Sequence, residues 1–209
     1  DYPHTNRIKI LVDVIIEFLY FILGLRELVL SPKDTRAAIH GVESMLFYWP
    51  DFISAKESWY FFNILLNETK WYQENISFWG KSTPVPRLTS WHSQQNKSYS
   101  YSGVVNPSNS YSKTLYQLHQ MIENLTQLKF NSVLLNLYRD GEDSMGWHSD
   151  DEVTLDRHAS IASLSLGAAR DFQIKPKDKS RKLSSISLAA GSLLVMKSPF
   201  QDKWLHRIP

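Results

Sequence analysis

The sequence predicts a mainly β domain with flanking helices, and three observations lead to this fold class. From residue 130 onward, short apolar or alternating runs are separated by Gly, Pro, Asp or Lys turns. Before that point, two segments have apolar residues at helical spacing. Between these segments, residues 72–110 are rich in Ser, Asn, Pro and aromatic residues, which is typical of short strands and long loops. Many short strands in succession indicate a β-sandwich or closed barrel, and a jelly roll is compatible with them.

The composition sets the limits of this interpretation. A chain of 209 residues is long enough for one sizeable core, so a single main domain is expected. The formal net charge is only +2, so a nucleic-acid contact would depend on a local basic patch. The absence of cysteine excludes a disulfide framework and a thiolate metal site, and it fits a reducing compartment.

The N-terminal residues 8–30 are largely apolar, with uninterrupted runs shorter than the roughly 18–20 residues that a membrane span requires. Asp13 and Glu17 are four positions apart, which favours one face of an amphipathic helix. A leader or an anchor is the alternative. We therefore expect residues 1–43 to be a helical extension of unknown role, and residues 44–209 to be the main domain.

Two helices are expected in the first half of that domain. Ser54 and Glu57 form a capping-box pattern that opens a helix reaching about Asn67. Its expected apolar stripe comprises Trp59, Phe62, Leu65 and Leu66. The second helix should cover residues 111–128, with a stripe of Leu115, Leu118, Ile122 and Leu125 and with His119 half-exposed.

The predicted strands are residues 130–139, 160–166, 170–175, 182–188, 193–196 and about 203–206. In the first of them, Asn136 and Tyr138 share a face with Leu134, whereas Leu135 and Leu137 share the other. A polar pair on an inward face needs hydrogen-bond partners, and an anionic ligand would supply them. An edge strand with that face in solvent is the alternative.

His148, Asp150 and His206 are the candidate metal ligands. His148 and Asp150 are two positions apart, so on an extended segment their side chains point the same way. Two imidazoles and one carboxylate are the ligand set of a facial iron(II) site, which leaves coordination positions free for a co-substrate and dioxygen. A surface turn with a satisfied histidine is the alternative. Asp151 is expected to have an outer-shell or substrate-binding role.

Aromatic and basic residues gather in the loop-rich part of the chain. Trp91, Tyr99 and Tyr101 lie near Arg87 and Lys97, and flat rings beside cations suit stacking on an unpaired base. The alternative is that these aromatic side chains cover the sheet, which applies most strongly to Trp91.

Taken together and in this order, these motifs resemble the AlkB family of iron(II)/2-oxoglutarate-dependent nucleic-acid dealkylases, especially its animal DNA- and RNA-repair members. The resemblance covers roughly residues 44–209. The matching stretches are residues 86–89 (PRLT), 99–103 (YSYSG), 130–132 (FNS), 136–139 (NLYR), 147–152 (WHSDDE), 161–168 (IASLSLGA), 191–196 (GSLLVM) and 204–209 (WLHRIP).

The resemblance implies a double-stranded β-helix (jelly roll) and assigns roles to individual residues. The metal triad would be His148, Asp150 and His206, and the 2-oxoglutarate contacts would be Asn136 and Tyr138. The base-pocket positions would be Arg87, Tyr99, Tyr101 and Asp151. Trp79, Gly80 and Lys81 resemble the segment that approaches the damaged strand.

One departure from the family is expected to matter. The strand after the second histidine supplies two arginines in the family, and one of them pairs with the distal carboxylate of 2-oxoglutarate. This chain stops before that strand, and its sequence offers no evident replacement. A jelly roll without its last strand should expose unpaired edge groups, bind iron weakly and turn over little.

The resemblance implies oxidative removal of small N-alkyl groups, such as those of 1-methyladenine and 3-methylcytosine, from DNA or RNA. The cofactors would be Fe(II) and 2-oxoglutarate, with O2 as oxidant, release of formaldehyde and a single-stranded or flipped-out base as substrate. We expect a monomer without an obligate protein partner, located in the nucleus, the cytoplasm or both. A single-strand-binding module that has lost catalysis, or an AlkB-like oxygenase acting on protein or lipid, are the alternatives.

Overall fold

The structure is a computed structural model of the whole chain. It describes residues 13–19, 41–42, 44–78, 81–94, 99–101, 104–106, 108–151, 159–178 and 183–209. All structural statements below refer to these residues.

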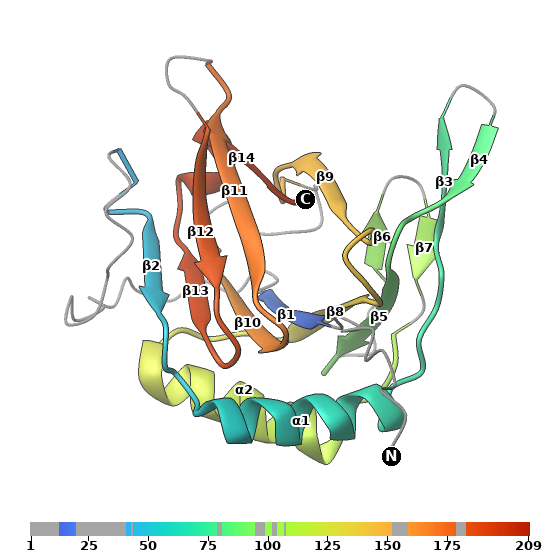
Figure 1. The fold of residues 1–209 in the computed structure, drawn as a ribbon, viewed down its shortest axis with the longest axis vertical. Coiled ribbons are helices and arrows are strands. Elements are labelled where there is room, and N and C mark those ends of the chain that lie inside the picture. Colours follow the sequence, from blue (N-terminus) through green and yellow to red (C-terminus); the bar gives the residue numbers. More distant parts are fainter. Residues whose placement is uncertain are drawn as a thin grey trace, which may run out of the picture.

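Two antiparallel sheets face each other (Figure 1). The larger sheet has the strand order β2 (Leu46–Trp49), β13 (Leu193–Met196), β10 (Ile161–Gly167), β1 (Asp13–Leu19), β8 (Ser132–Tyr138) and β5 (Leu88–Ser93). The smaller sheet has the order β12 (Ser184–Leu188), β11 (Arg170–Pro176), β14 (Trp204–Ile208) and β9 (Met145–His148). This arrangement confirms the prediction of a mainly β fold of the jelly-roll type.

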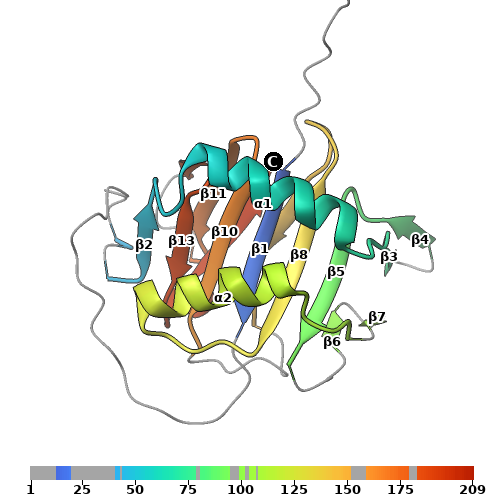
Figure 2. The same cartoon turned by 90° about the horizontal axis from the view of Figure 1, so that it is seen from below.

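Two hairpins extend beyond the β5 end of the larger sheet (Figures 1 and 2). One pairs β3 (Asn75–Phe78) with β4 (Lys81–Pro84), and the other pairs β6 (Tyr99–Tyr101) with β7 (Val104–Asn106). They account for the short strands that the sequence predicted between residues 72 and 110.

Helices α1 (Ala55–Glu68) and α2 (Lys113–Thr126) cover the outer face of the larger sheet (Figure 2). Ser54 caps α1 in a capping box with Glu57, as predicted. The predicted stripes are wrong at one residue each, because Trp59 and Leu125 are exposed and lie at the edge of their stripes, while Phe61 and His119 are buried. Neither helix is long and apolar enough to cross a membrane.

The larger sheet is buried on both faces, and this divides the apolar core in two. Along β8, Leu135 and Leu137 pack in the cluster under the helices, whereas Leu134 and Tyr138 pack in the cluster between the sheets. Asn136 alternates with these last two and so points into the space between the sheets. The alternative of a solvent-facing edge strand is therefore wrong for β8, which pairs with both β1 and β5.

The helix expected across residues 8–30 is wrong for Asp13–Leu19, which form strand β1. This strand pairs antiparallel with β10 on one side and with β8 on the other. Ile15 packs between the sheets and Ile16 packs under the helices, so successive side chains fill both cores. Because β1 pairs with both β8 and β10, neither of these two strands has an unpaired edge at this position. The domain boundary at residue 43 stays a prediction.

Candidate active site

The three candidate ligands lie at the junction of two neighbouring strands. β9 and β14 pair so that His148 is directly opposite His206, and Asp150 follows two residues after β9 ends. His148 Nε2 is 3.6 Å from Asp150 Oδ1, and His206 Nε2 is 3.5 Å from Asp150 Oδ2. One ligand atom from each residue lies within 4.8 Å of the others. Strand pairing thus brings together residues that are distant in the sequence.

Each imidazole is held in a defined orientation. His148 Nδ1 lies 2.9 Å from the Gly146 carbonyl oxygen, which assigns the proton to Nδ1 and leaves Nε2 with a lone pair towards Asp150. The His206 ring stacks on Phe172, with centroids 5.3 Å apart, and is buried. Neither ring nitrogen of His206 has a hydrogen-bond partner in the part of the chain that the structure describes. A metal ion bound to one ring nitrogen would supply the partner that this buried imidazole lacks.

The charges of the site also favour a cation. Burial, with Asp151 near by, raises the pKa of Asp150 to about 7. Burial, followed by the proximity of His148 and Lys177, lowers the pKa of His206 well below its usual value, so this imidazole is neutral at physiological pH. A neutral imidazole is the form that binds a metal, and a metal ion would compensate the buried carboxylate.

The spacing fits one ion with small adjustments. Ligand atoms at right angles on bonds of about 2.1 Å lie roughly 3.0 Å apart. The two His–Asp150 separations of 3.6 and 3.5 Å are about half an ångström longer, and all three ligand atoms lie within 4.8 Å of one another. Two imidazoles and one carboxylate on one side of an ion are the ligand set of a facial iron(II) site. The residues present therefore fit the metal that their sequence pattern predicted.

Comparison with known proteins agrees with this geometry. Residues 45–209 match the model of the family described as the 2OG-Fe(II) oxygenase superfamily. The chain belongs to the 2OG-Fe(II) oxygenase superfamily. Enzymes of this superfamily use Fe(II) as the metal and 2-oxoglutarate as the co-substrate.

Within this superfamily the chain is similar to AlkB homologues, as the sequence motifs indicated. It is 35% identical over 200 residues to the alpha-ketoglutarate-dependent dioxygenase alkB homolog 3 of Mus musculus and to that of Homo sapiens, covering 89% of this chain and 65% of each relative. It is 35% identical over 141 residues to the DNA oxidative demethylase ALKBH2 of Homo sapiens, covering 64% of this chain and 54% of the relative. The chain therefore spans less than two thirds of the length of these relatives.

Gln201 is a site residue of this oxygenase that the sequence did not reveal. It lies in the short helix α3 (Phe200–Lys203), where a turn was expected. Its Nε2 donates to Asp150 Oδ2 at 3.2 Å, and its Oε1 accepts from the Asp150 N–H at 3.1 Å. The amide thus fixes the carboxylate against its own backbone. A lone Gln in a turn carries no sequence signal for such a role.

Replacing Gln201 with Ala should weaken metal binding by about 10- to 100-fold, because groups that orient metal ligands commonly contribute this much. Titration of the metal-free protein with Mn(II) would measure the effect. Lys203→Ala in the same helix is the matched control, since Lys203 is exposed. Equal Mn(II) affinity of Gln201→Ala and the control would contradict the positioning role.

The residues expected at the co-substrate lie beside the triad in the fold. Asn136 and Tyr138 on β8 and His206 on β14 all point into the space between the sheets, because their alternate neighbours share one apolar cluster. The guanidinium of Arg170 lies 5.0 Å from the centre of the Tyr138 ring. Arg87 Nε donates to Asn136 Oδ1 at 2.9 Å. The structure thus brings Arg87 to a residue predicted for the co-substrate.

The structure describes the other predicted site residues only in part. The side chain of Asp151 is largely exposed, and its Oδ2 lies 3.3 Å from Lys177 Nζ in an ion pair. Partial burial alone would raise the pKa of Asp151, but Ser149 and Lys177 together lower it. Tyr99 and Tyr101 form part of β6, and Lys81 begins β4, but their side chains lie outside the described part of the structure, as do Trp79 and Gly80. Trp91 is buried in the core, as its alternative reading predicted.

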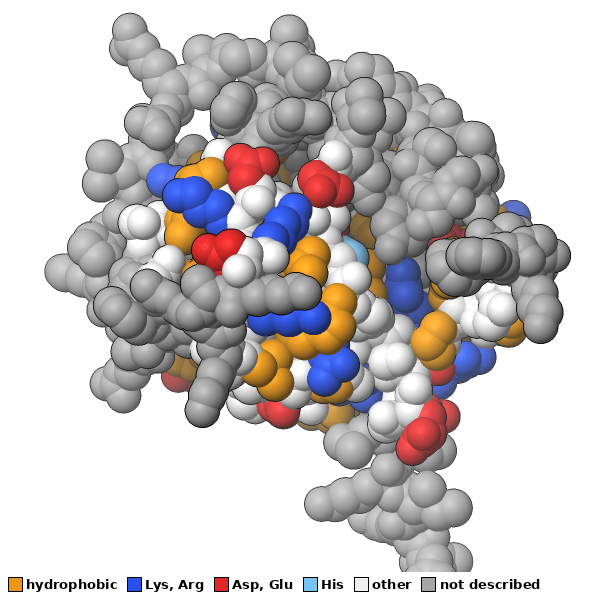
Figure 3. Space-filling model, turned by 90° about the horizontal axis from the view of Figure 1, so that it is seen from above, with side chains coloured by type: hydrophobic (Ala, Val, Ile, Leu, Met, Phe, Trp, Pro, Cys, Tyr) orange, Lys and Arg blue, Asp and Glu red, His pale blue; other side chains and the backbone are white. Residues whose placement is uncertain are grey.

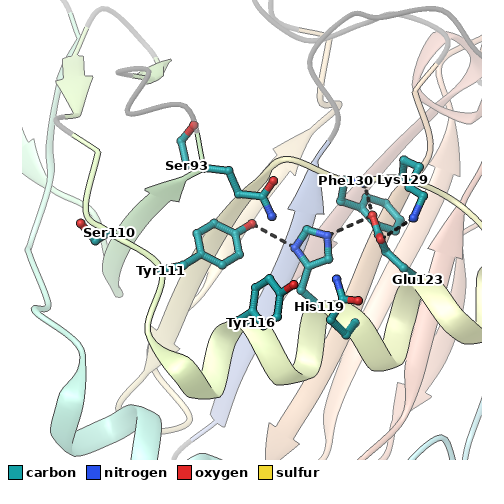
Figure 4. A pocket seen from close by; sticks show the side chains of 10 residues that line it. Ser93, Ser110, Tyr111, Tyr116, His119, Glu123, Lys129 and Phe130 are labelled. Carbon is teal, nitrogen blue, oxygen red and sulfur yellow. Dashed lines mark hydrogen bonds and ion pairs between the residues drawn. The ribbon is translucent and has the colours of Figure 1, made fainter.

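A second polar cluster lies on the helix side, beside a hollow of about 590 Å³ (Figure 4). His119 is buried, which corrects the prediction of a half-exposed residue, and it lies 3.3 Å from the Tyr111 hydroxyl and 3.0 Å from Glu123. Glu123 also pairs with Lys129 and accepts the Phe130 N–H. Burial alone would raise the pKa of Glu123, but Lys129, the Phe130 N–H and His119 lower it. The polar groups of this cluster are thus hydrogen-bonded to one another. The hydrogen bond from the Phe130 N–H to Glu123 links α2 to the segment directly before β8.

Proposed function

We propose that this protein removes small N-alkyl groups oxidatively from nucleobases of DNA or RNA, such as the methyl groups of 1-methyladenine and 3-methylcytosine. The observation that supports this most directly is the His148, Asp150 and His206 cluster within a 2OG-Fe(II) oxygenase fold. The similarity to AlkB homologues, including a DNA oxidative demethylase, supports the choice of substrate.

In this proposal the residues of the chain have separate tasks. His148, Asp150 and His206 bind the metal on one side and leave the opposite side accessible to co-substrate and oxygen. With 2-oxoglutarate and O2, the iron supplies the oxidising power that converts the N-alkyl carbon to an aldehyde. For a methyl substrate the products are the repaired base, formaldehyde, succinate and carbon dioxide. Gln201 keeps the Asp150 carboxylate in place.

The substrate would approach the open end of the sandwich. Viewed from above, a His side chain is visible in a hollow of the surface, with Lys and Arg side chains on both sides of it (Figure 3). The β3–β4 and β6–β7 hairpins rise beside this end (Figure 1). We assign Tyr101 and His148 to the two sides of a flipped base, and Tyr99 and Asp151, with residues 79–81, to the nucleic-acid contact.

We further propose that the protein acts as a monomer without an obligate protein partner, in the nucleus, the cytoplasm or both. The cysteine-free composition fits these reducing compartments.

The function predicts that His148→Ala and Asp150→Ala each lower formaldehyde release from a methylated single-stranded oligonucleotide by at least about 1000-fold, since each removes a metal ligand. Formaldehyde and succinate should be measured together, with His119→Gln as the control because His119 lies in the separate helix-side cluster. Near-normal release from either Ala variant would reject the metal assignment.

The same assay separates the alternatives. Oligonucleotide binding without any succinate from the wild-type protein would indicate a binding module that has lost catalysis. Succinate formation that methylated oligonucleotides neither stimulate nor compete with would indicate an oxygenase with a different substrate.

A further inference from the structure

Arg87 carries a buried positive charge. Its residue is only 5% exposed, directly before β5, and its side chain points into the space between the sheets like those of Thr89 and Trp91 at alternate positions. A guanidinium has five N–H donors and stays charged at all physiological pH values. Such a charge is costly in a protein interior unless an anion or several acceptors surround it.

The described residues satisfy Arg87 only in part. Its Nε donates to Asn136 Oδ1, and no carboxylate of the described chain lies within ion-pair distance. Glu74, the buried carboxylate close by in the fold, accepts from the Thr89 hydroxyl at 2.8 Å. Arg170 makes the comparison clear, because its guanidinium donates to the carbonyl oxygens of Asp140, Asp143 and Pro209 and stacks on Tyr138. Arg170 has its partners within the chain, whereas the two terminal nitrogens of Arg87 have no hydrogen-bond partner among the described residues.

Further donors lie on the same side of the larger sheet. Since Asn136 Oδ1 accepts from Arg87, its Nδ2 is the donor end of the amide, and it has no acceptor among the described residues. Ser165 on β10 has a buried hydroxyl in the same state. Both residues are in register with Ile15 of β1, one on each side. Donors that all lack acceptors indicate an anionic ligand.

We propose that Arg87, together with Asn136, binds a carboxylate group of 2-oxoglutarate. This inference rests on the proposed function for the identity of the co-substrate. It replaces the base contact that the sequence assigned to Arg87. The side chain lies on Asn136, inside the sandwich, and a guanidinium matches a carboxylate in shape as well as charge.

The test is direct binding of 2-oxoglutarate to the Mn(II)-loaded protein without oxygen turnover, by calorimetry. Arg87→Gln should raise the dissociation constant by about 10- to 100-fold, the loss typical of hydrogen bonds to a charged group. Arg87→Lys should recover part of the affinity, because it keeps the charge but not the fork of donors. Arg207→Gln is the matched control, since Arg207 binds Gln173 and stacks on Trp147 on the outer face of β14.

Two further measurements show whether Arg87→Gln loses 2-oxoglutarate binding specifically, and which carboxylate of the ligand is affected. The Mn(II) affinity of Arg87→Gln should equal that of the wild type, which excludes a general loss of structure. Binding of 2-oxobutyrate, which lacks the second carboxylate, shows which group Arg87 holds: a loss for both ligands assigns the carboxylate beside the keto group, and a loss for 2-oxoglutarate alone assigns the distal one.

An unchanged dissociation constant for 2-oxoglutarate in Arg87→Gln overturns the proposal. If that variant also binds the oligonucleotide more weakly, Arg87 contacts the substrate base, as the family resemblance implied. A wild-type protein that binds no 2-oxoglutarate overturns it as well. A wild type that binds 2-oxoglutarate through Arg87 but releases no formaldehyde supports the proposal and counts against the dealkylase function instead.

Discussion

Replacing Asp150 with Asn is expected to stabilise the metal-free protein at pH 8 while abolishing its response to a divalent metal. Burial raises the pKa of Asp150 from 3.8 to about 7. Between these values the folded protein keeps a proton that the unfolded chain releases, so this residue lowers stability as the pH rises from about 4 to 7. The shift corresponds to roughly 4 kcal/mol at pH 8. An amide of the same shape removes that cost.

Thermal unfolding in EDTA at pH 8 measures the first effect. The midpoint should rise by about 8–16 °C, given roughly 2–4 °C per kcal/mol for a chain of this size. His206 does not interfere, because its pKa is lowered and it is neutral at pH 8 in both folded and unfolded states. Asp171→Asn is the control, since Asp171 is exposed on β11. An Asp150→Asn protein that melts at or below the wild-type temperature would contradict the buried charge.

Addition of Mn(II) measures the second effect. Metal binding should raise the midpoint of the wild type and leave that of Asp150→Asn unchanged. In the wild type the Mn(II) affinity should itself increase between pH 6 and 8, because the carboxyl group must lose its proton before it can bind the metal. A pH-independent affinity across this range would argue that Asp150 is not a ligand.

Local patterns sufficed to predict the second half of the fold. Strand β8 and strands β10 to β14 begin and end within about two residues of their predicted bounds, because turn residues separate them, whereas β9 was not among the predicted strands. The metal ligands were also predictable: His148 and Asp150 are close in sequence, and the AlkB-like motif order selected His206. Their proximity depends on the pairing of β9 with β14, and this contact between distant segments leaves no local pattern.

Strand β1 was missed for a physical reason. Asp13 and Glu17 are four positions apart, and this spacing places two side chains on one face of a helix and equally on one face of a strand. A central strand is apolar on both faces, so it lacks the alternation that distinguishes a strand from a buried helix. Gln201 and the Arg87–Asn136 contact were missed because both depend on neighbours that only the folded chain supplies.

The position of β1 makes a strong prediction about stability. Ile16 is fully buried under the helices, opposite Leu164 of β10 and Leu135 of β8. Ile16→Ala should lower the free energy of unfolding by about 2–5 kcal/mol, the usual cost of such a cavity in a core. Chemical denaturation measures it, with Leu125→Ala as the control at an exposed helix position, where the change should stay below about 1 kcal/mol.

Removal of residues 1–19 is the more severe form of the same test. Without β1, the inner edges of β8 and β10 lose their partner strand, and the two halves of the larger sheet are no longer joined. We expect this shortened protein to lose cooperative unfolding and to aggregate. If it instead melts like the intact chain, and Ile16→Ala behaves like Leu125→Ala, then the segment is not part of the sheet. The space between β8 and β10, next to Asn136 and Ser165, must then have another occupant.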